Sequence, residues 1–112
     1  MIDLSQASKL TKIGEGAFLD IEDEILYLPE NVKDITDAFA TYTNGKRFSS
    51  IHFRSQLPPS IASRYDMIIS CDTLYIPKGC KENYLKGSTT YSDGEIVLSN
   101  YLRISSGIII EE

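Results

Sequence analysis

The chain has 112 residues, of which 42% are hydrophobic and 24% are charged, and its formal net charge is −5. This composition is typical of one small globular domain and excludes a disordered chain. An acidic chain lacks the basic footprint that nucleic-acid phosphates require, and no apolar run approaches the roughly 20 residues that cross a bilayer. We therefore expect neither a nucleic-acid partner nor insertion into a membrane.

The first residues, Met1 to Gln6, lack the basic and apolar regions of a signal peptide. If Met1 is the native start, we expect the protein in the cytoplasm or in a virion. If the chain is a fragment of a longer protein, this expectation no longer holds, and an extracellular location is equally compatible with the sequence.

A short apolar–any–apolar triplet recurs along the chain every 22 to 25 residues. The five triplets are Ile2-Asp3-Leu4, Leu26-Tyr27-Leu28, Ile51-His52-Phe53, Leu74-Tyr75-Ile76 and Ile96-Val97-Leu98. A nearly fixed period with one short strand per unit is typical of a solenoid, in which stacked units share one core. Alternation along a strand directs the outer two side chains inward and the middle one to solvent. The pattern predicts a mainly β fold, a short leucine-rich-repeat-type solenoid with irregular C-terminal strands.

The segments that follow the first two triplets carry matching apolar residues. Ile13 matches Ile35, and Ala17-Phe18 matches Ala38-Phe39, in the same order along both units. These pairs are expected to fill equivalent positions of the core.

The third and fourth units depart from this pattern. In the third unit, Ile61 and residues 67–69 are expected to fill the same volume, and residues 41–47 read as a surface turn. In the fourth unit, residues 81–87 predict about one helical turn that ends at Gly87.

The final segment, residues 95–110, is strand-like throughout. Its three apolar stretches are Ile96-Val97-Leu98, Leu102-Arg103-Ile104 and Ile108-Ile109-Ile110, separated by Ser, Asn and Gly turn residues. The last stretch is apolar on both faces, so it either seals the end of the solenoid or pairs with a partner chain. We assign residues 1–87 to the solenoid and residues 88–112 to a C-terminal β extension or cap of the same domain.

Several motifs occur in a fixed order at this period. They are Ile13-Gly14-Glu15-Gly16-Ala17-Phe18, Leu26-Tyr27-Leu28-Pro29-Glu30-Asn31-Val32-Lys33-Asp34-Ile35, Ala38-Phe39, Pro58-Pro59-Ser60-Ile61 and Leu74-Tyr75-Ile76-Pro77-Lys78-Gly79, with Tyr84 following. Together they resemble the BspA-type leucine-rich repeats of gut Bacteroidetes and some parasitic protists. The resemblance covers residues 10–84 and leaves residues 88–112 outside it. It implies a curved β-rich solenoid that binds other macromolecules, usually on cell surfaces.

The sequence offers no constellation that supports an enzyme. His52 is the sole histidine, and no serine or cysteine lies in a nucleophile-elbow context, so we expect no catalysis, no metal site and no cofactor. As the middle residue of its triplet, His52 is expected to be exposed. The acidic residues 20–24 lack the spacing of a calcium loop and predict a solvated turn. Cys71 and Cys80 are expected to be unlinked, with a bridge between them possible only in an oxidising compartment.

The candidate partner-binding residues are the middle residues of the triplets, which should stack in one column on the exposed sheet face. They are Asp3, Tyr27, His52, Tyr75 and Val97, and the apolar Ile108 and Ile110 of the last strand join them. Large, rigid, amphipathic side chains of this kind are favoured at interfaces. Alternatively, Tyr27 and Tyr75 only favour strand formation and pack on each other.

These features predict a non-catalytic interaction or structural module of a larger assembly, such as a capsid-associated component of a phage virion. Its partner is then another protein or a further copy of itself. The alternative is a fragment of a secreted bacterial adhesin that binds a host protein or a glycan. The missing leader and the apolar last strand favour the first hypothesis, and the family resemblance favours the second.

Overall fold

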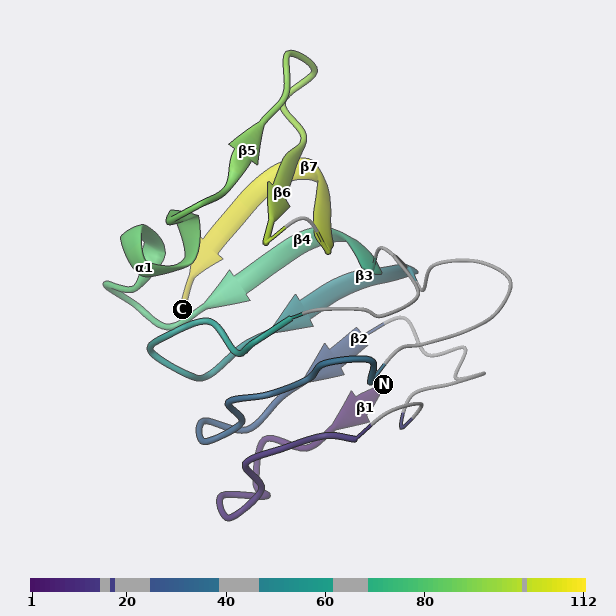
Figure 1. Ribbon diagram of the computed structural model, residues 1–112, viewed down its shortest axis with the longest axis vertical. Coiled ribbons are helices and arrows are strands. Elements are labelled where there is room, and N and C mark those ends of the chain that lie inside the picture. Colours follow the sequence, from purple (N-terminus) through teal and green to yellow (C-terminus); the bar gives the residue numbers. More distant parts are fainter. Residues whose placement is uncertain (15–16, 18–24, 39–46, 62–68, 100) are drawn as a thin grey trace.

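A computed structural model describes residues 1–14, 17, 25–38, 47–61, 69–99 and 101–112 of the chain. These residues form one seven-stranded mixed sheet and one short helix (Figure 1). The elements are β1 (Ile2–Asp3), β2 (Ile25–Tyr27), β3 (Arg47–His52), β4 (Ile69–Ile76), α1 (Lys81–Leu85), β5 (Thr89–Thr90), β6 (Ile96–Leu98) and β7 (Leu102–Glu111). The order of strands in the sheet is β1-β2-β3-β4-β7-β6-β5. The prediction of a mainly β fold is therefore confirmed, since the described residues form one mixed sheet and little helix.

Five strands, β1 to β4 and β7, run parallel, and the sequence repeat sets the register of the first four. Leu26 lies opposite Ile51, and Ile51 lies opposite Leu74. All three side chains are buried in one core, together with the third residues of the same triplets, Leu28, Phe53 and Ile76. The predicted inward direction of the outer triplet residues is thus confirmed for the second to fourth triplets. A two- or three-residue strand gains stability here because its neighbours cover its apolar side.

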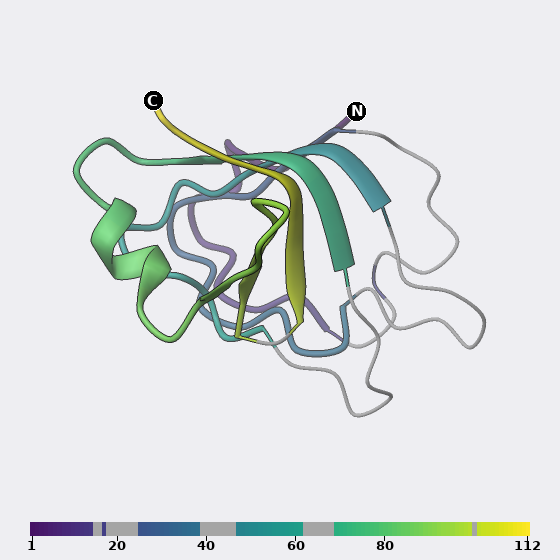
Figure 2. The ribbon, with the colours of Figure 1, turned by 90° about the horizontal axis from the view of Figure 1, so that it is seen from above.

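A second, much shorter parallel ladder lies on the other side of the core. Lys12 bridges to Asp34, and Asp34 bridges to Ser60. Ile13 donates its backbone N–H to the Asp34 carbonyl at 3.0 Å, and Ile35 donates to the Ser60 carbonyl at 2.9 Å. Seen along the stack, the long strands follow one side and this ladder follows the opposite side (Figure 2).

The fifth position of the parallel stack is taken by a different segment from the one expected. Ile109 lies opposite Leu74, and Ile110 lies opposite Tyr75. Val97 instead pairs with Arg103 in an antiparallel hairpin of β6 and β7. The expectation that Ile96-Val97-Leu98 forms the fifth unit is wrong, because β7 occupies the place beside β4. The few residues between β6 and β7 suffice only for a hairpin turn, so β6 pairs with β7 in the antiparallel direction.

β7 continues as one strand through the residues for which the sequence predicts a turn. The Ser105 hydroxyl donates to the Asp72 carboxylate at 2.9 Å, and the Ser106 hydroxyl donates to the Asp72 carbonyl. These bonds join β7 to β4 where the register of the two strands shifts. Gly107, with φ +71°, follows directly. The turn-type residues therefore bend β7 without ending it.

The predicted helical turn is confirmed as α1, and Gly87 follows it with φ +72°. From α1 the buried Tyr84 side chain reaches the loop after β3. Its hydroxyl donates to the Ser55 carbonyl at 2.7 Å, and its ring lies 5.6 Å from that of Phe53, centroid to centroid. Burial raises the pKa of Tyr84 to about 12, so the phenol stays protonated and keeps its donor. α1 thereby fixes the position of that loop.

Several positions of the sequence prediction lie outside the described residues. They are Phe18, Phe39, the acidic residues 20–24, the turn residues 41–46, and residues 67 and 68. Of the remaining positions expected in the core, Ile13, Ile35, Ala38, Ile61 and Ile69 are buried. Ala17 is exposed, so its expected match with Ala38 as a core residue is wrong.

Candidate functional site

The middle residues of four triplets form one column on the outward face of the parallel strands. The register pairs Asp3 with Tyr27, Tyr27 with His52, His52 with Tyr75, and Tyr75 with Ile110. These five residues are termed the aromatic column. They point away from the core because they alternate along each strand with the residues that face it.

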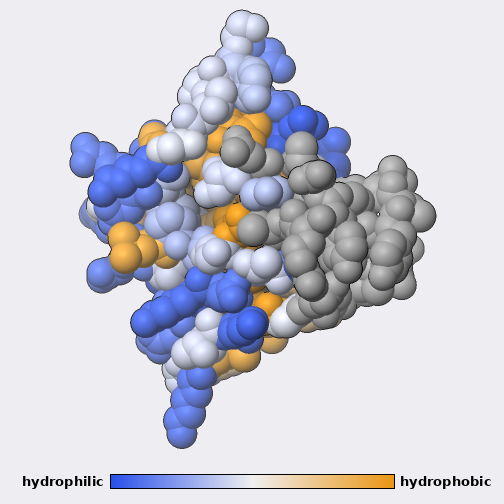
Figure 3. Space-filling model, in the orientation of Figure 1, coloured by the Kyte–Doolittle hydropathy of each residue, from blue (hydrophilic) through white to orange (hydrophobic). Residues whose placement is uncertain are grey.

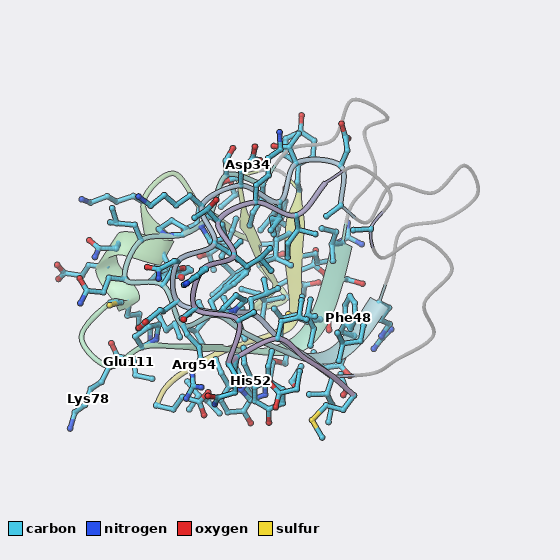
Figure 4. All side chains as sticks on the ribbon, turned by 90° about the horizontal axis from the view of Figure 1, so that it is seen from below. Asp34, Phe48, His52, Arg54, Lys78 and Glu111 are labelled. Carbon is cyan, nitrogen blue, oxygen red and sulfur yellow. The ribbon has the colours of Figure 1, made fainter. Side chains whose placement is uncertain are left out.

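His52 lies at the centre of the column and is covered by its neighbours. Its ring centroid lies 4.0 Å from that of Tyr27 and 4.2 Å from that of Tyr75, with interplanar angles of 20° and 6°. Although it lies across the core from Asp34, on the outward face (Figure 4), only 7% of the residue is exposed. The expectation of an exposed His52 is wrong because in-register strands about 4.8 Å apart bring both tyrosine rings over the imidazole. The tyrosines consequently pack on His52 and not on each other.

Both ring nitrogens of His52 have polar partners. Nδ1 lies 2.8 Å from Oε1 of Glu112, and Nε2 lies 3.2 Å from Oγ of Ser50. An ionised carboxylate can only accept, so Nδ1 carries a proton, and in the neutral ring Nε2 accepts from the serine hydroxyl. The imidazole is therefore held in its plane by two hydrogen bonds and on its two faces by aromatic rings.

The stacking covers both faces of the His52 ring and one face of each tyrosine ring. Within the described part of the chain, the hydroxyls of Tyr27 and Tyr75 have no hydrogen-bond partner. Because the imidazole of His52 stacks between the two tyrosines, their ring centroids are no more than about 8 Å apart along the column. The column thus presents two fixed phenol hydroxyls above a rigid aromatic stack.

The two ends of the column differ in chemistry. Asp3 is exposed, and hydrogen bonds from the side chain and the backbone N–H of Ser5 hold the pKa of its carboxyl below the usual value. At the opposite end, Ile110 is 38% exposed, and Ile108 in the adjacent row is 50% exposed. The column therefore runs from an anionic end to an aliphatic end.

Sequence reasoning misplaced one member of this site and missed two others. Val97 is buried on β6, away from the column, and Ile110 occupies the position expected for it. Ser50 was missed, although its position two residues before His52 on one strand places both side chains on the same face. The contact of Glu112 with His52 could be predicted only from the register of β7 on β4, which the sequence does not reveal.

A groove of about 680 Å³ adjoins the column at the carboxyl ends of β2, β3 and β4. Its walls include Glu30 and Lys33 after β2, Arg54 and Leu57 after β3, and Pro77 after β4. Arg54 and Pro77 each come two residues after a member of the column, and Arg54 lies on the same side of the molecule as His52, opposite Asp34 (Figure 4). Its walls combine one acidic, two basic and several apolar side chains, which suits a mixed polypeptide surface. The sequence gives no direct signal for the groove because its walls come from three successive units.

The opposite side of the molecule is mostly polar. The segments of the second ladder run in front of the strands in Figure 1, and Figure 3 shows this side as largely hydrophilic with small, separate apolar spots. Its ion pair between Lys12 and Asp34, at 3.8 Å, is exposed and contributes little to stability. Scattered apolar residues on such a surface are ordinary. The column side is the more distinctive candidate.

The described residues contain no group of three or more His, Cys, Asp and Glu side chains that could hold a metal ion. Cys71 and Cys80 are buried free thiols. Burial, with the neighbouring Asp72 carboxylate, raises the pKa of Cys71 to about 12, so it stays protonated and is a poor nucleophile. In the same part of the chain, no helix has the length and apolarity needed to span a bilayer.

No protein-family model, no curated protein and no solved structure matches the chain. The resemblance to BspA-type repeats therefore continues to rest on the sequence motifs.

Proposed function

We propose that this protein is a non-catalytic interaction module that binds a protein partner through the aromatic column and the adjoining groove. The observation that carries the proposal is the stack of Tyr27, His52 and Tyr75, which fixes two phenol hydroxyls, unpaired among the described residues, beside a groove. Rigid aromatic side chains supply contact area at low entropic cost, which is why interfaces favour them. The setting that we propose is a larger structural assembly, such as a virion with this chain as a capsid-associated component.

We also propose that residues 1–87 form a short leucine-rich-repeat-type solenoid. The support comes from the constant register of the triplets and from the second ladder through Lys12, Asp34 and Ser60. A chain that contributes one paired segment to each side of a core in every unit follows the course of a solenoid. In this interpretation, β7 and the hairpin of β5 and β6 act as the cap of one end.

The geometry of the rings favours a protein partner over a glycan. Sugar rings bind aromatic side chains by stacking on an open ring face. In the column, both faces of His52 are covered, and each tyrosine has one face on His52. The ring edges, the two hydroxyls and one outer face of each tyrosine remain. Together with Ile110 they offer a polypeptide both hydrogen bonds and apolar packing. An adhesin that recognises a glycan is therefore the second candidate.

The contacts of His52 match two bonds of a Ser–His–acid triad, but their surroundings favour a positioning role. Ser50 lies at Nε2, and Glu112 lies at Nδ1. Acyl transfer also needs N–H donors directed at the developing oxyanion, usually the largest single contribution to catalysis. The strand around Ser50 pairs with β2 and with β4, so its backbone N–H groups are used in those ladders. We assign Ser50 and Glu112 to holding the imidazole in the stack.

Removal of the two hydroxyls tests the proposal without removing the stack. The double variant Tyr27→Phe and Tyr75→Phe keeps all three rings, whereas alanine at these positions would also remove the packing on His52. A photo-reactive benzoylphenylalanine in place of the exposed Arg54 reports on the column side. The same group in place of Tyr91, which is 51% exposed on the β5–β6 hairpin, serves as the control.

The expected result is one discrete cross-linked protein from position 54 and none from position 91, in extracts or assemblies of the producing cells. The double phenylalanine variant should lose this product while its urea unfolding midpoint stays unchanged. An identical product from position 91, or a product unaffected by removal of the hydroxyls, would exclude the column as the binding surface.

A further inference from the structure

β7 changes neighbours halfway along its length. Residues 102–104 pair with β6, whereas residues 108–111 pair only with β4. The change occurs at Gly107, where an added Cβ would overlap the carbonyl oxygen of Gly94 and lie 3.0 Å from its carbon. The hairpin of β5 and β6 therefore follows β7 closely up to the bend. Beyond the bend, no strand formed by the described residues lies against the outer edge of β7.

The backbone of this edge carries hydrogen-bonding groups that point away from β4. Glu112 donates its backbone N–H to the Ile76 carbonyl at 2.9 Å, so Glu112 faces β4. Backbone groups alternate in direction along a strand, so Ile110 also faces β4, whereas Ile109 and Glu111 face away. Among the described residues, no backbone partner exists for the outward N–H and C=O groups of these two residues. The edge is a template for a further strand.

The side chains of this edge also distinguish it from the other two edges of the sheet. β1 presents the charged Asp3, and β5 consists of Thr89 and Thr90 alone. Charge and short length are the usual protections of a strand edge. Beside the free edge of β7, Ile108 and Ile110 are 50% and 38% exposed. Exposed β-branched side chains beside unpaired backbone groups favour the addition of a strand.

We propose that the free edge of β7, residues 108–111, binds an extended, aliphatic-rich segment of a partner protein as an added β-strand. Main-chain hydrogen bonds to Ile109 and Glu111 hold the segment, and alternate side chains pack on Ile108 and Ile110. This inference deepens the proposed protein-binding function, on which it rests, by giving the conformation of the bound partner. The segment pairs over about four residues, since the hairpin occupies the edge before Gly107.

A second copy stacked unit on unit is the less suitable occupant. β6 and β5 lie beyond β7 in the sheet, in the place where a further complete unit would continue the stack (Figure 1). A single extended segment needs only the edge itself. The partner therefore contributes a strand and not a whole repeat.

Amide hydrogen exchange of the full chain, followed by NMR, tests this proposal. The probe is an acetylated and amidated peptide with the sequence of residues 72–78, because this segment already pairs with β7 along its other edge. In the free protein we expect rapid exchange at Ile109 and Glu111 and protection at Ile110. The peptide should protect the first two amides and leave the third unchanged.

Two substitutions separate edge pairing from packing. Ile109→Pro removes an outward N–H and should weaken peptide binding about tenfold, as expected for the loss of one hydrogen bond, whereas Ile109→Val keeps the donor and the affinity. If the proline variant fails to fold, Ile110→Lys places a charge beside the edge on the exposed face and should also abolish binding. Wild-type affinity in the folded Ile109→Pro variant, or in Ile110→Lys where the proline variant does not fold, would overturn the proposal.

The remaining outcomes are equally decisive. Protection of Ile109 and Glu111 without peptide, at all dilutions, would show that the chain itself covers the edge and would overturn the proposal. If the Ile109 and Glu111 amides are protected without peptide and the molecular mass of the protein rises with its concentration, a second copy of the chain binds the edge in place of a partner segment. That result would also overturn the proposal. The Tyr27→Phe and Tyr75→Phe variant should bind the peptide normally. Failure of the column proposal therefore leaves the peptide result unchanged, and failure of the edge proposal leaves the cross-linking result unchanged.

Discussion

Alanine at Gly107 should destabilise the protein more than alanine at Gly87, although the two glycines have nearly the same positive φ angle. Their φ angles are +71° and +72°. A Cβ in this left-handed region costs about 1–2 kcal/mol at either position. At Gly87 nothing lies within 4 Å of the added atom, whereas at Gly107 it overlaps the carbonyl oxygen of Gly94. The difference between the two variants therefore isolates the close approach of the hairpin to β7.

The extra cost at Gly107 arises because the obstructing atoms belong to the backbone and cannot rotate away. Relief requires a shift of the β5–β6 hairpin or a straighter β7, and overpacking of this kind costs about 1–3 kcal/mol. Added to the cost of the left-handed conformation, the expected loss is about 2–5 kcal/mol. This is a large share of the roughly 5–15 kcal/mol that stabilises a small domain.

Urea unfolding of the wild type, Gly87→Ala and Gly107→Ala measures the three free energies of unfolding under one set of conditions. We expect the larger loss at Gly107, accompanied by faster amide exchange in β5 and β6. Losses that agree within about 0.5 kcal/mol would contradict the close approach of Gly94, since both variants would then carry only the cost of the backbone conformation.

Three side-chain contacts give further predictions. His52→Ala removes two ring stacks and a charge-assisted hydrogen bond, and should lower the free energy of unfolding by about 1–3 kcal/mol; an unchanged urea midpoint would exclude a stabilising column. Tyr84→Phe leaves a carbonyl of the loop after β3 unpaired and should cost about 1 kcal/mol, with faster exchange in that loop. Hydrogen bonds from the Ser105 hydroxyl and from Arg47 hold the pKa of the Asp72 carboxyl below its usual value. The ionised carboxylate therefore stabilises the fold fully above the usual pKa, and this contribution is lost as the pH falls through the lowered pKa of the folded state. Asp72→Asn should accordingly lower stability at neutral pH, and its difference from the wild type should narrow at acid pH; an unaltered pH dependence of the unfolding midpoint would contradict this assignment.

The repeat could be predicted from the sequence because each unit carries its own copy of the pattern. Leu26, Ile51 and Leu74 each begin a triplet, and periodicity alone predicts that they share one face and one register. The helical turn before Gly87 is equally local, since it depends on neighbouring residues and a terminating glycine. Features encoded within one unit can therefore be predicted from the amino-acid sequence.

Features that depend on lateral neighbours cannot be predicted in this way. The burial of His52 comes from rings contributed by the units before and after it, and not from its own triplet. The place of Ile110 in the column depends on the choice between two apolar stretches, which the hairpin of β6 and β7 decides. Glu112 and the groove walls depend on that same register. Sequence spacing identifies the units but does not determine which segment completes their stack.

The pairing of the strands also implies a direction in which the native structure opens. β1 pairs with β2 through Ile2 and Asp3, and Leu4 adds one backbone hydrogen bond to Tyr27, whereas β7 pairs along β4 and also with β6. In a stack where each unit contacts only its neighbours, local unfolding starts at the weaker end and proceeds inward. The first unit should therefore fray while the central strands remain closed. The column then loses its anionic end long before it loses the aromatic centre, so that Tyr75 and His52 lie in the most persistent part of the fold.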